Sequence, residues 1–175
     1  MPAALCPRWG GRVLAHAVGS VAALALVLLL AGCALPSRVP PGTAQAEVLA
    51  RLGPPTAVHA LPSGQRLLYS ELPAGFAAYN LDFDTAGRLV RNEQVLTQQR
   101  FENLPTGTWT RADVERTFGP PLRIERVARF DGDIWTYRFR ENSDPRLAHV
   151  HLDRAGVVRM VMFTDELPFF DNARD

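Results

Sequence analysis

Along residues 42–164 the apolar residues first recur at the spacing of a helix and then alternate with polar residues as in a strand. This succession of two patterns occurs twice. Each round opens with apolar residues at helical spacing, such as Val48, Leu49 and Leu52, and then changes to runs that alternate between apolar and polar residues. A spacing of three to four residues predicts an amphipathic helix, and strict alternation predicts a half-buried strand. The pattern therefore predicts an α+β fold in which a short helix packs on about four antiparallel strands, in two tandem repeats.

The same short motifs occur at corresponding places in both rounds of this pattern. Gly53-Pro54-Pro55 recurs as Gly119-Pro120-Pro121, and Asp84-Thr85-Ala86-Gly87 recurs as Asp153-Arg154-Ala155-Gly156. The spacing is about 66–69 residues, and repetition at a nearly fixed spacing is typical of a repeated structural unit. We therefore expect one repeat over residues 42–98, a second over residues 99–164, and a tail over residues 165–175.

The helix of the second repeat has clear end signals. Thr110 and Asp113 have the spacing of a capping box, and Val114 and Phe118 lie one turn apart on one face. Gly119 suits the left-handed position that ends a helix, and the two prolines after it prevent continuation. The first helix carries the same signals less clearly.

Strands are predicted on both sides of the two Asp-x-Ala-Gly turns. Residues 79–84 alternate Tyr, Leu and Phe with Asn and Asp, and residues 148–153 alternate Ala, Val and Leu with His and Asp. Two further strands, over 122–129 and 134–140, are expected to join at Asp131-Gly132, a tight hairpin signal. The apolar sides would pack on the helices, which would leave a mostly polar sheet face open.

The first 33 residues have the pattern of a lipoprotein signal. Arg8 and Arg12 precede an uncharged apolar run over residues 18–30, which ends in Leu30-Ala31-Gly32-Cys33. These four residues resemble the bacterial lipobox, which implies cleavage after residue 32 and a diacylglycerol on the Cys33 thiol. An uncleaved membrane anchor is the weaker alternative, because the strictly apolar run is short for a span. Residues 33–41, which hold three prolines, are expected to form a semi-rigid tether behind the lipid.

Composition narrows the chemistry that the chain can perform. The sequence has 19 Lys and Arg in total and all are arginine, so chemistry that needs a lysine is excluded. A net charge of +1 gives no reason to expect a nucleic-acid partner. Cys6 leaves with the signal, so the lipidated Cys33 is the one cysteine that remains and no disulfide is expected. Ala34 at the next position favours the outer membrane under the usual sorting rule for lipoproteins.

A family resemblance rests on the second repeat. The run from Gly107 to Pro121, followed by Trp135-Thr136-Tyr137 and the turn over 153–156, resembles the SmpA/OmlA (BamE-like) small outer-membrane lipoproteins. The resemblance covers residues 42–163 and implies a helical segment packed on a small antiparallel sheet. It also implies a role beside the machinery that folds β-barrels into the outer membrane. Two such units in tandem also resemble the β-lactamase-inhibitor-protein fold, whose concave sheet binds its target.

The sequence offers little catalytic chemistry. His149 and His151 share a strand face at a spacing that suits zinc, with Asp82 as a third ligand through the repeat, but solvated polar residues are the favoured interpretation. Asp82 and Asp84 share a face and would suit an acid–base pair, although Asp84 is already explained by its turn. No catalytic or phosphate-binding motif is present. We therefore expect no enzyme activity, no metal and no cofactor.

Five residues are predicted to contact a partner. Trp109, at the start of the second helix, is either a binding hot spot or a staple-like contact of that helix. Arg138 and Arg140 are expected on the polar face beside His149 and His151, with a solvated face as the alternative. The apolar tail Leu167-Pro168-Phe169-Phe170 either covers a sheet edge or presents a docking peptide.

Taken together, the sequence predicts a lipid-anchored outer-membrane lipoprotein that faces the periplasm. It would carry acyl chains such as palmitate at Cys33 and serve, without catalysis, as a protein-interaction module of the cell envelope. The first expected partner is an envelope protein in or near the β-barrel assembly complex. The alternative is a periplasmic binding or inhibitory module that docks an enzyme through its concave sheet.

Overall fold

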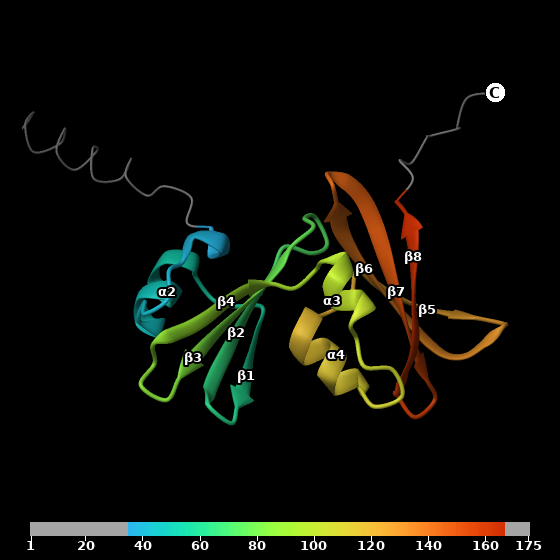
Figure 1. The fold of residues 1–175 in the computed structure, drawn as a ribbon, viewed down its shortest axis with the longest axis horizontal. Helices are drawn as coiled ribbons and strands as arrows, with labels where there is room; N and C mark the ends of the chain where they lie inside the picture. Colours follow the sequence, from blue (N-terminus) through green and yellow to red (C-terminus); the bar gives the residue numbers. More distant parts are fainter. Residues whose placement is uncertain (1–34, 167–175) are drawn as a thin grey trace, which may run out of the picture. The chain divides into compact units, whose positions relative to one another are not determined.

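The computed structural model describes residues 35–166, which form an α+β fold with two four-stranded antiparallel sheets (Figure 1). The helical elements are η1 (Pro36–Arg38), α2 (Gln45–Leu52), α3 (Gln98–Glu102) and α4 (Arg111–Phe118). The first sheet contains β1 (Ala57–Leu61), β2 (Gly64–Ser70), β3 (Ala78–Asp84) and β4 (Leu89–Gln94). The second contains β5 (Arg123–Val127), β6 (Phe130–Glu141), β7 (Asp144–Asp153) and β8 (Val158–Asp165).

Three of the sequence predictions lie outside the described residues. They are the signal peptide over 1–32, the lipidation site at Cys33 and the apolar tail that begins at Leu167. Within residues 35–166, none of the helices has the length and apolar character needed to cross a membrane.

Each sheet is a meander in which every strand pairs with its neighbours in the sequence. The predicted Asp-x-Ala-Gly turns join β3 to β4 and β7 to β8, as expected. In the first turn the Asp84 carboxylate accepts a hydrogen bond from the Arg88 backbone N–H at 2.8 Å. In the second turn the Asp153 carboxylate accepts one from the Val157 N–H at 2.9 Å. In both turns, therefore, the side chain of the first aspartate accepts a hydrogen bond from the backbone N–H of the residue after the glycine.

α2 packs on one face of the first sheet. Val48 is fully buried there against Leu67 and Leu81, which project from adjacent strands. The Tyr69 hydroxyl donates a hydrogen bond to the Gly53 carbonyl at 3.0 Å, at the C-terminal end of the helix. The helix end is therefore fixed to the sheet by a side chain as well as by apolar contact.

α4 is fixed to the second sheet in the same way. It begins with the predicted capping box, in which the Asp113 N–H donates to Thr110 Oγ1 at 3.4 Å and the Thr110 N–H donates to the Asp113 carboxylate at 2.9 Å. At its other end the Tyr137 hydroxyl donates to the Gly119 carbonyl at 2.9 Å. Phe118 is 1% exposed, against the sheet.

The polar face of the first sheet is not open, contrary to the sequence-based expectation, because α4 packs against it. Asn80 is 1% exposed and donates from Nδ2 to the Thr117 carbonyl at 2.9 Å. Leu68, on the same sheet face, is fully buried beside the end of α4. Asp82 forms a bidentate ion pair with Arg66 at 2.6 and 2.8 Å. The pair neutralises both charges in the largely buried space between the first sheet and α4. α4 therefore contacts a sheet on each of its two sides.

α3 is an element that the sequence patterns did not predict. Thr97 caps it by accepting a hydrogen bond from the Arg100 N–H at 3.3 Å. Its Phe101 ring stacks on Phe118 with centroids 4.4 Å apart. Ala78, Val95 and Leu96 join the same cluster, so residues from β3 and from the segment after β4 complete the hydrophobic core of the second sheet.

The hairpin between β5 and β6 turns earlier than predicted. The turn lies at Ala128-Arg129, whereas Asp131 and Gly132 are inside β6. Gly132 is required for a different reason, since a Cβ at this position would meet the Leu152 carbonyl oxygen at 2.0 Å. The glycine therefore permits close approach of two strands rather than a change of direction.

The predicted tether is packed against the first sheet from Pro36 onward. η1 and the residues after it lie beside β4, where Asn92 Nδ2 donates to the carbonyls of Pro36 at 2.8 Å and Val39 at 3.1 Å. Val39 is 6% exposed and belongs to the core under α2. The hydrogen bonds from Asn92 therefore hold this segment on the fold rather than away from it.

The two glycines that end α2 and α4 provide a test of the packing around α4. Both have positive φ, 77° at Gly53 and 78° at Gly119. A Cβ at Gly53 would meet nothing within 4 Å, whereas a Cβ at Gly119 would lie 3.0 Å from Leu68 Cδ2. We expect Gly53→Ala to cost about 1–2 kcal/mol of unfolding free energy from backbone strain. Gly119→Ala should cost about 1–3 kcal/mol more, because it also overpacks the contact with the first sheet.

Urea unfolding followed by tryptophan fluorescence measures both losses. Leu68→Ala should cost less in the Gly119→Ala background than in the parent chain, and it should cost the same in the Gly53→Ala background as in the parent chain. Equal losses for the two glycine variants would mean that α4 does not press on the first sheet.

Candidate interaction surface

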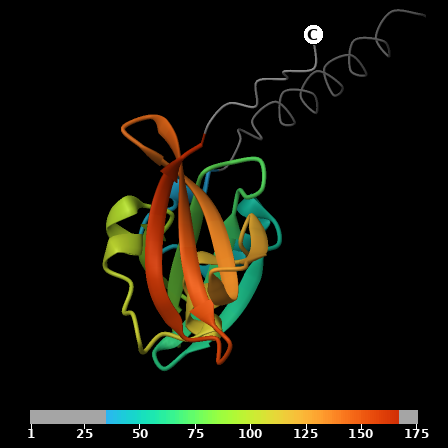
Figure 2. The same ribbon diagram turned by 90° about the vertical axis from the view of Figure 1, so that its right-hand side faces the viewer.

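One face of the second sheet is covered by none of the described helices, and Figure 2 looks onto this side of the molecule. α4 packs on the opposite face, through Val114 and Phe118. We call the uncovered side the outer face. The register places on it, among others, Arg123, Glu125, Ile134, Thr136, Leu147, His149, His151, Met160, Met162 and Thr164. None of the described helices covers this face, but it is only partly open: Ile134, Thr136, Leu147 and His151 on it are each at most 8% exposed.

A row of three hydrogen-bonded side chains crosses the outer face. His149 Nδ1 lies 3.0 Å from Thr136 Oγ1, and its Nε2 lies 2.9 Å from Thr164 Oγ1, so the imidazole bridges β6 and β8. Burial lowers the pKa of His149, and the positive charge of Arg123 lowers it further. The ring is therefore held neutral, with both nitrogens engaged.

His151 lies two residues after His149 on β7, on the same sheet face. It is 8% exposed, and the Phe130 ring meets it edge to face with centroids 4.8 Å apart. Burial lowers the pKa of His151 as well. The structure thus brings the two predicted histidines together on the outer face, where they act as packed, neutral rings rather than as solvated charges.

Two methionines add exposed apolar surface beside these rings. Met160 and Met162 are 43% and 48% exposed, and the register sets them opposite His151 and His149. Thioether side chains are polarizable and adaptable, and they are common at surfaces that bind other proteins. These methionines are not among the predicted partner contacts, although the sequence carries a signal for them: Met160 and Met162 alternate with the apolar Val161 and Phe163, so this strand is apolar on both sides.

Arg138 and Arg140, predicted as partner contacts, are engaged within the chain. Arg138 donates to the Pro73 carbonyl at 3.1 Å and forms an ion pair with Glu166. Its guanidinium lies 5.2 Å from the centroid of the Phe76 ring, and that of Arg140 lies 4.3 Å from the same ring. Both arginines therefore hold the loop between β2 and β3 to the edge of the second sheet. A charge-reversing variant here would disturb the fold as well as any partner.

Trp109 lies at the start of α4, where it is half-buried against the core of the second sheet. Its ring centroid is 6.5 Å from that of Phe118. Of the two roles considered for Trp109, this geometry favours the staple-like contact. Trp135, Tyr137 and Phe139 are core residues, as expected.

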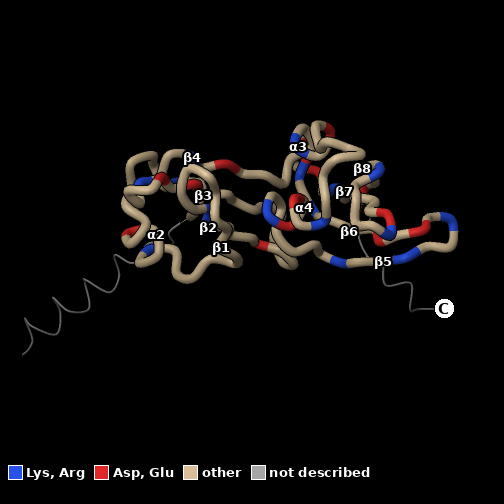
Figure 3. The backbone as a smooth tube through the Cα atoms, turned by 90° about the horizontal axis from the view of Figure 1, so that it is seen from below, with Lys and Arg blue, Asp and Glu red and all other residues tan. Residues whose placement is uncertain are grey.

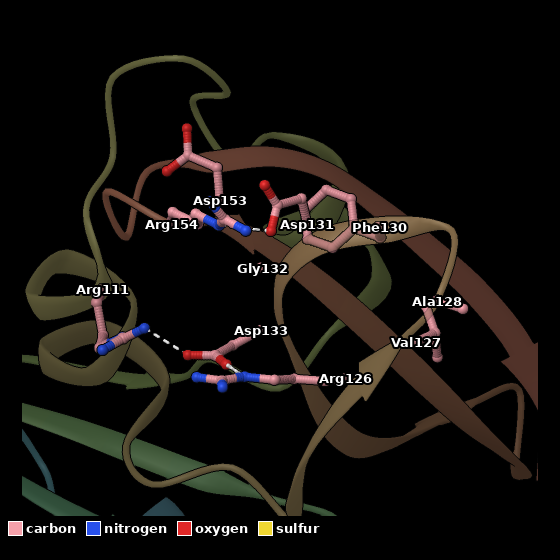
Figure 4. A pocket seen from close by; sticks show the side chains of 10 residues that line it. All are labelled: Arg111, Arg126, Val127, Ala128, Phe130, Asp131, Gly132, Asp133, Asp153 and Arg154. Carbon is pink, nitrogen blue, oxygen red and sulfur yellow. Dashed lines mark hydrogen bonds and ion pairs between the residues drawn. The ribbon is translucent and has the colours of Figure 1, made fainter.

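A polar hollow of about 610 Å³ opens beside the β5–β6 hairpin (Figure 4). At its centre Asp133 forms ion pairs with Arg111 at 2.5 Å and Arg126 at 2.7 Å. At its rim Asp131 is 2.6 Å from Arg154. The hydrogen bond from Arg126 is the main reason that the pKa of Asp133 lies below its ordinary value, so this carboxyl group stays ionised. An ionised acid matched by two arginines has no proton to give as a general acid.

The other acid and metal candidates are also used structurally. Asp82 is paired with Arg66 in the first sheet, and Asp84 closes its turn. The structure therefore does not bring Asp82 to His149 and His151 as a third zinc ligand. Between residues 35 and 166, no three His, Cys, Asp or Glu side chains are grouped as a metal ion would require.

Charge is spread over the described residues without a dominant sign. Figure 3 shows basic and acidic positions interspersed along the backbone. A surface of this kind lacks the single-sign stripe that steers polyanions.

Comparison with known proteins identifies no relative. No family model matches the sequence, and no curated protein matches it. Among solved structures, the chain is weakly similar to a DUF4309 family protein (YjgB) from Bacillus subtilis subsp. subtilis str. 168, with a TM-score of 0.30 and 17% identity. The match covers 71% of this chain and 79% of the other. A likeness this weak carries no argument about fold or function.

The histidines of the outer face should make stability depend on pH. The folded-state pKa values of His149 and His151 lie below the ordinary value of 6.5. As the pH falls through 6.5, these two histidines therefore bind protons in the unfolded chain but not yet in the folded chain. The free energy of unfolding falls as a result. It should reach a lower plateau once the pH is below the folded-state values. NMR titration of the ring protons, with urea unfolding at each pH, measures both quantities.

A double variant, His149→Gln with His151→Gln, should flatten most of this dependence. A smaller slope should remain from His59, whose pKa is lowered by burial, and His59→Gln serves as the control that removes this slope alone. The carboxyl groups of Asp113, Asp133 and Asp153 have pKa values lowered from the ordinary 3.8, so their titration lies outside this window. Unshifted titration of both rings near pH 6.5 would contradict the packed, neutral state.

Proposed function

We propose that this chain is a lipoprotein of the outer membrane, anchored through Cys33 and facing the periplasm, that acts as a protein-interaction module of the cell envelope. The sequence Leu30-Ala31-Gly32-Cys33 behind an apolar run supports the anchor. The partner would be an envelope protein in or near the β-barrel assembly complex, in keeping with the resemblance to the SmpA/OmlA (BamE-like) lipoproteins. Neither nucleic acid nor a cofactor is part of this proposal.

Matching contacts in the two sheets support a tandem repeat over residues 42–98 and 99–164. The two sheets have the same strand order. In each, a tyrosine hydroxyl bonds the carbonyl of the glycine that ends the helix: Tyr69 to Gly53, and Tyr137 to Gly119. An isolated bridge also ties the start of each helix to the strand after the turn, from Ala44 to Arg88 and from Thr110 to Val157.

The observation that carries an interaction role is the outer face of the second sheet. It joins two exposed methionines to a fixed row of Thr136, His149 and Thr164. Exposed apolar side chains set among ordered polar groups are typical of protein-binding surfaces. The rigid row fixes hydrogen-bonding positions in advance, and the methionines provide contact area that adapts to a partner.

The surroundings of the acidic residues support a role without catalysis. Asp131 and Asp133 are matched by arginines, Asp82 is matched by Arg66, and Asp84 bonds the backbone of its turn. A general acid or base needs a free carboxyl group or imidazole beside a space for substrate.

The same face would also suit the alternative, a module that docks and inhibits a periplasmic enzyme. The identity of the captured protein separates the two functions. We would crosslink the lipidated protein in outer membranes, purify it and identify its partners by mass spectrometry. We expect components of the β-barrel assembly complex, lost when Cys33→Ala prevents anchoring. Capture of one soluble hydrolase that persists in Cys33→Ala would instead favour the inhibitory module.

Charge placed on the outer face should abolish partner capture without unfolding the domain. In Met160→Glu with Met162→Glu, both carboxylates would be desolvated on binding, so we expect the crosslinked yield to fall by at least about tenfold. The matched control is Leu49→Glu with Val58→Glu, which changes two residues with exposures of 36% and 51% on α2 and β1. Circular dichroism and urea unfolding confirm that both pairs still fold. Normal capture by the methionine variant would exclude this face as the binding site.

A further inference from the structure

A second surface, on the first sheet, lies where the proposed lipid anchor joins the folded chain. It consists of Leu35, Arg38, Pro40 and Pro41 from the N-terminal segment with Val90 and Arg91 from β4, and we call it the anchor-side patch. We propose that the anchor-side patch lies directly on the phospholipid bilayer, so that the first sheet is seated on the membrane. This inference rests on the proposed lipidation of Cys33.

The short distance along the chain is the first argument. Only three peptide units separate Cys33 from Pro36, and a fully extended chain spans at most about 3.6 Å per residue. Pro36 therefore lies within about 11 Å of the lipidated residue. The headgroup region on each side of a bilayer is about 5–8 Å deep, so the fold begins at the membrane surface.

The second argument is that the segment after Pro36 cannot act as a spacer. Asn92 holds it through the carbonyls of Pro36 and Val39. The Gly42 N–H then donates to the Leu89 carbonyl at 2.7 Å, and the Leu89 N–H donates to the Thr43 carbonyl at 2.9 Å. Four hydrogen bonds thus fix the segment to β4, and a lipid at Cys33 would draw this edge of the sheet to the bilayer.

The chemistry of the patch agrees with a membrane partner. A hollow of about 530 Å³ is lined by Arg38 and Arg91, by Pro40 and Val90, and by six further residues none of which is acidic. Val90 is 56% exposed and Leu35 is 44% exposed. Exposed apolar side chains flanked by arginines suit the boundary between anionic headgroups and acyl chains.

The experiment measures how close β4 lies to lipid. With the signal removed and Cys33 acylated, the chain has no free thiol, so a single introduced cysteine accepts an environment-sensitive fluorophore. We would label Val90→Cys in the full lipidated protein. The matched control is Val58→Cys, 51% exposed on β1, three strands and roughly 14 Å away. Both are placed in vesicles of phosphatidylethanolamine and phosphatidylglycerol that contain a lipid with a nitroxide near its headgroup.

We expect quenching at position 90 to be several-fold stronger than at position 58. Asn92→Asp replaces the donor that holds Pro36 and Val39 with a group that cannot donate, so it should reduce this difference. Arg38→Glu with Arg91→Glu should reduce it as well, most strongly when the anionic lipid is included.

Mass spectrometry of the N-terminal peptide separates the two ways of failing. A lipidated Cys33 with equal quenching at positions 58 and 90 would overturn the seating on the membrane and leave the proposed function intact. An unmodified Cys33 would overturn the lipid anchor and this inference together.

Discussion

The burial of α4 on both of its sides is the contact on which the rest of the fold depends. Towards the second sheet it buries Val114 and Phe118, and large apolar side chains contribute about 1.5–3 kcal/mol each when fully buried. Towards the first sheet its Thr117 carbonyl accepts a hydrogen bond from Asn80, and Gly119, which has no side chain, leaves room for Leu68. Small four-stranded sheets bury little surface alone, so a helix shared by both covers the apolar face of the second sheet and the polar face of the first with the same eight residues.

This arrangement shows which features a sequence can predict. The capping box at Thr110, the glycines that end α2 and α4, and the two aspartate turns follow from local chemistry within four residues, and the structure has all of them. The second contact side of α4 is non-local. Leu68 and Asn80 meet it across 37 residues or more. Asn80 alternates with Leu81 as in an open sheet, whereas Leu68 beside Leu67 is a sign that β2 is apolar on both faces. The period of a strand says which side chains share a face but not what covers that face.

The candidate site divides in the same way. Placing His149 and His151 together needed only the alternation of β7. Arg138 and Arg140 are expected to bind a partner because strand alternation places them on the polar face beside the histidines. Phe76 and Pro73, which engage them, come from the loop between β2 and β3 of the first sheet. The hairpin prediction failed for a related reason: Asp131-Gly132 has turn chemistry, but Gly132 is needed where β6 passes the Leu152 carbonyl. Residue type indicates a requirement for a small side chain, and only the packing tells which requirement it is.

The layers around α4 would decide which sheet lies nearer to the proposed lipid anchor. The N-terminal segment is bonded to β4 of the first sheet, and α4 separates that sheet from the second. A lipid at Cys33 would therefore hold the first sheet at the membrane and leave the second sheet, with its methionines, on the far side of α4. With a flexible tether the domain would turn freely and any face would meet a partner. With three peptide units between anchor and fold, the direction of the outer face is restricted by the same contacts that stabilise the domain. A partner embedded in the same membrane would then meet the outer face already oriented towards it. The domain would lose less orientational freedom on binding.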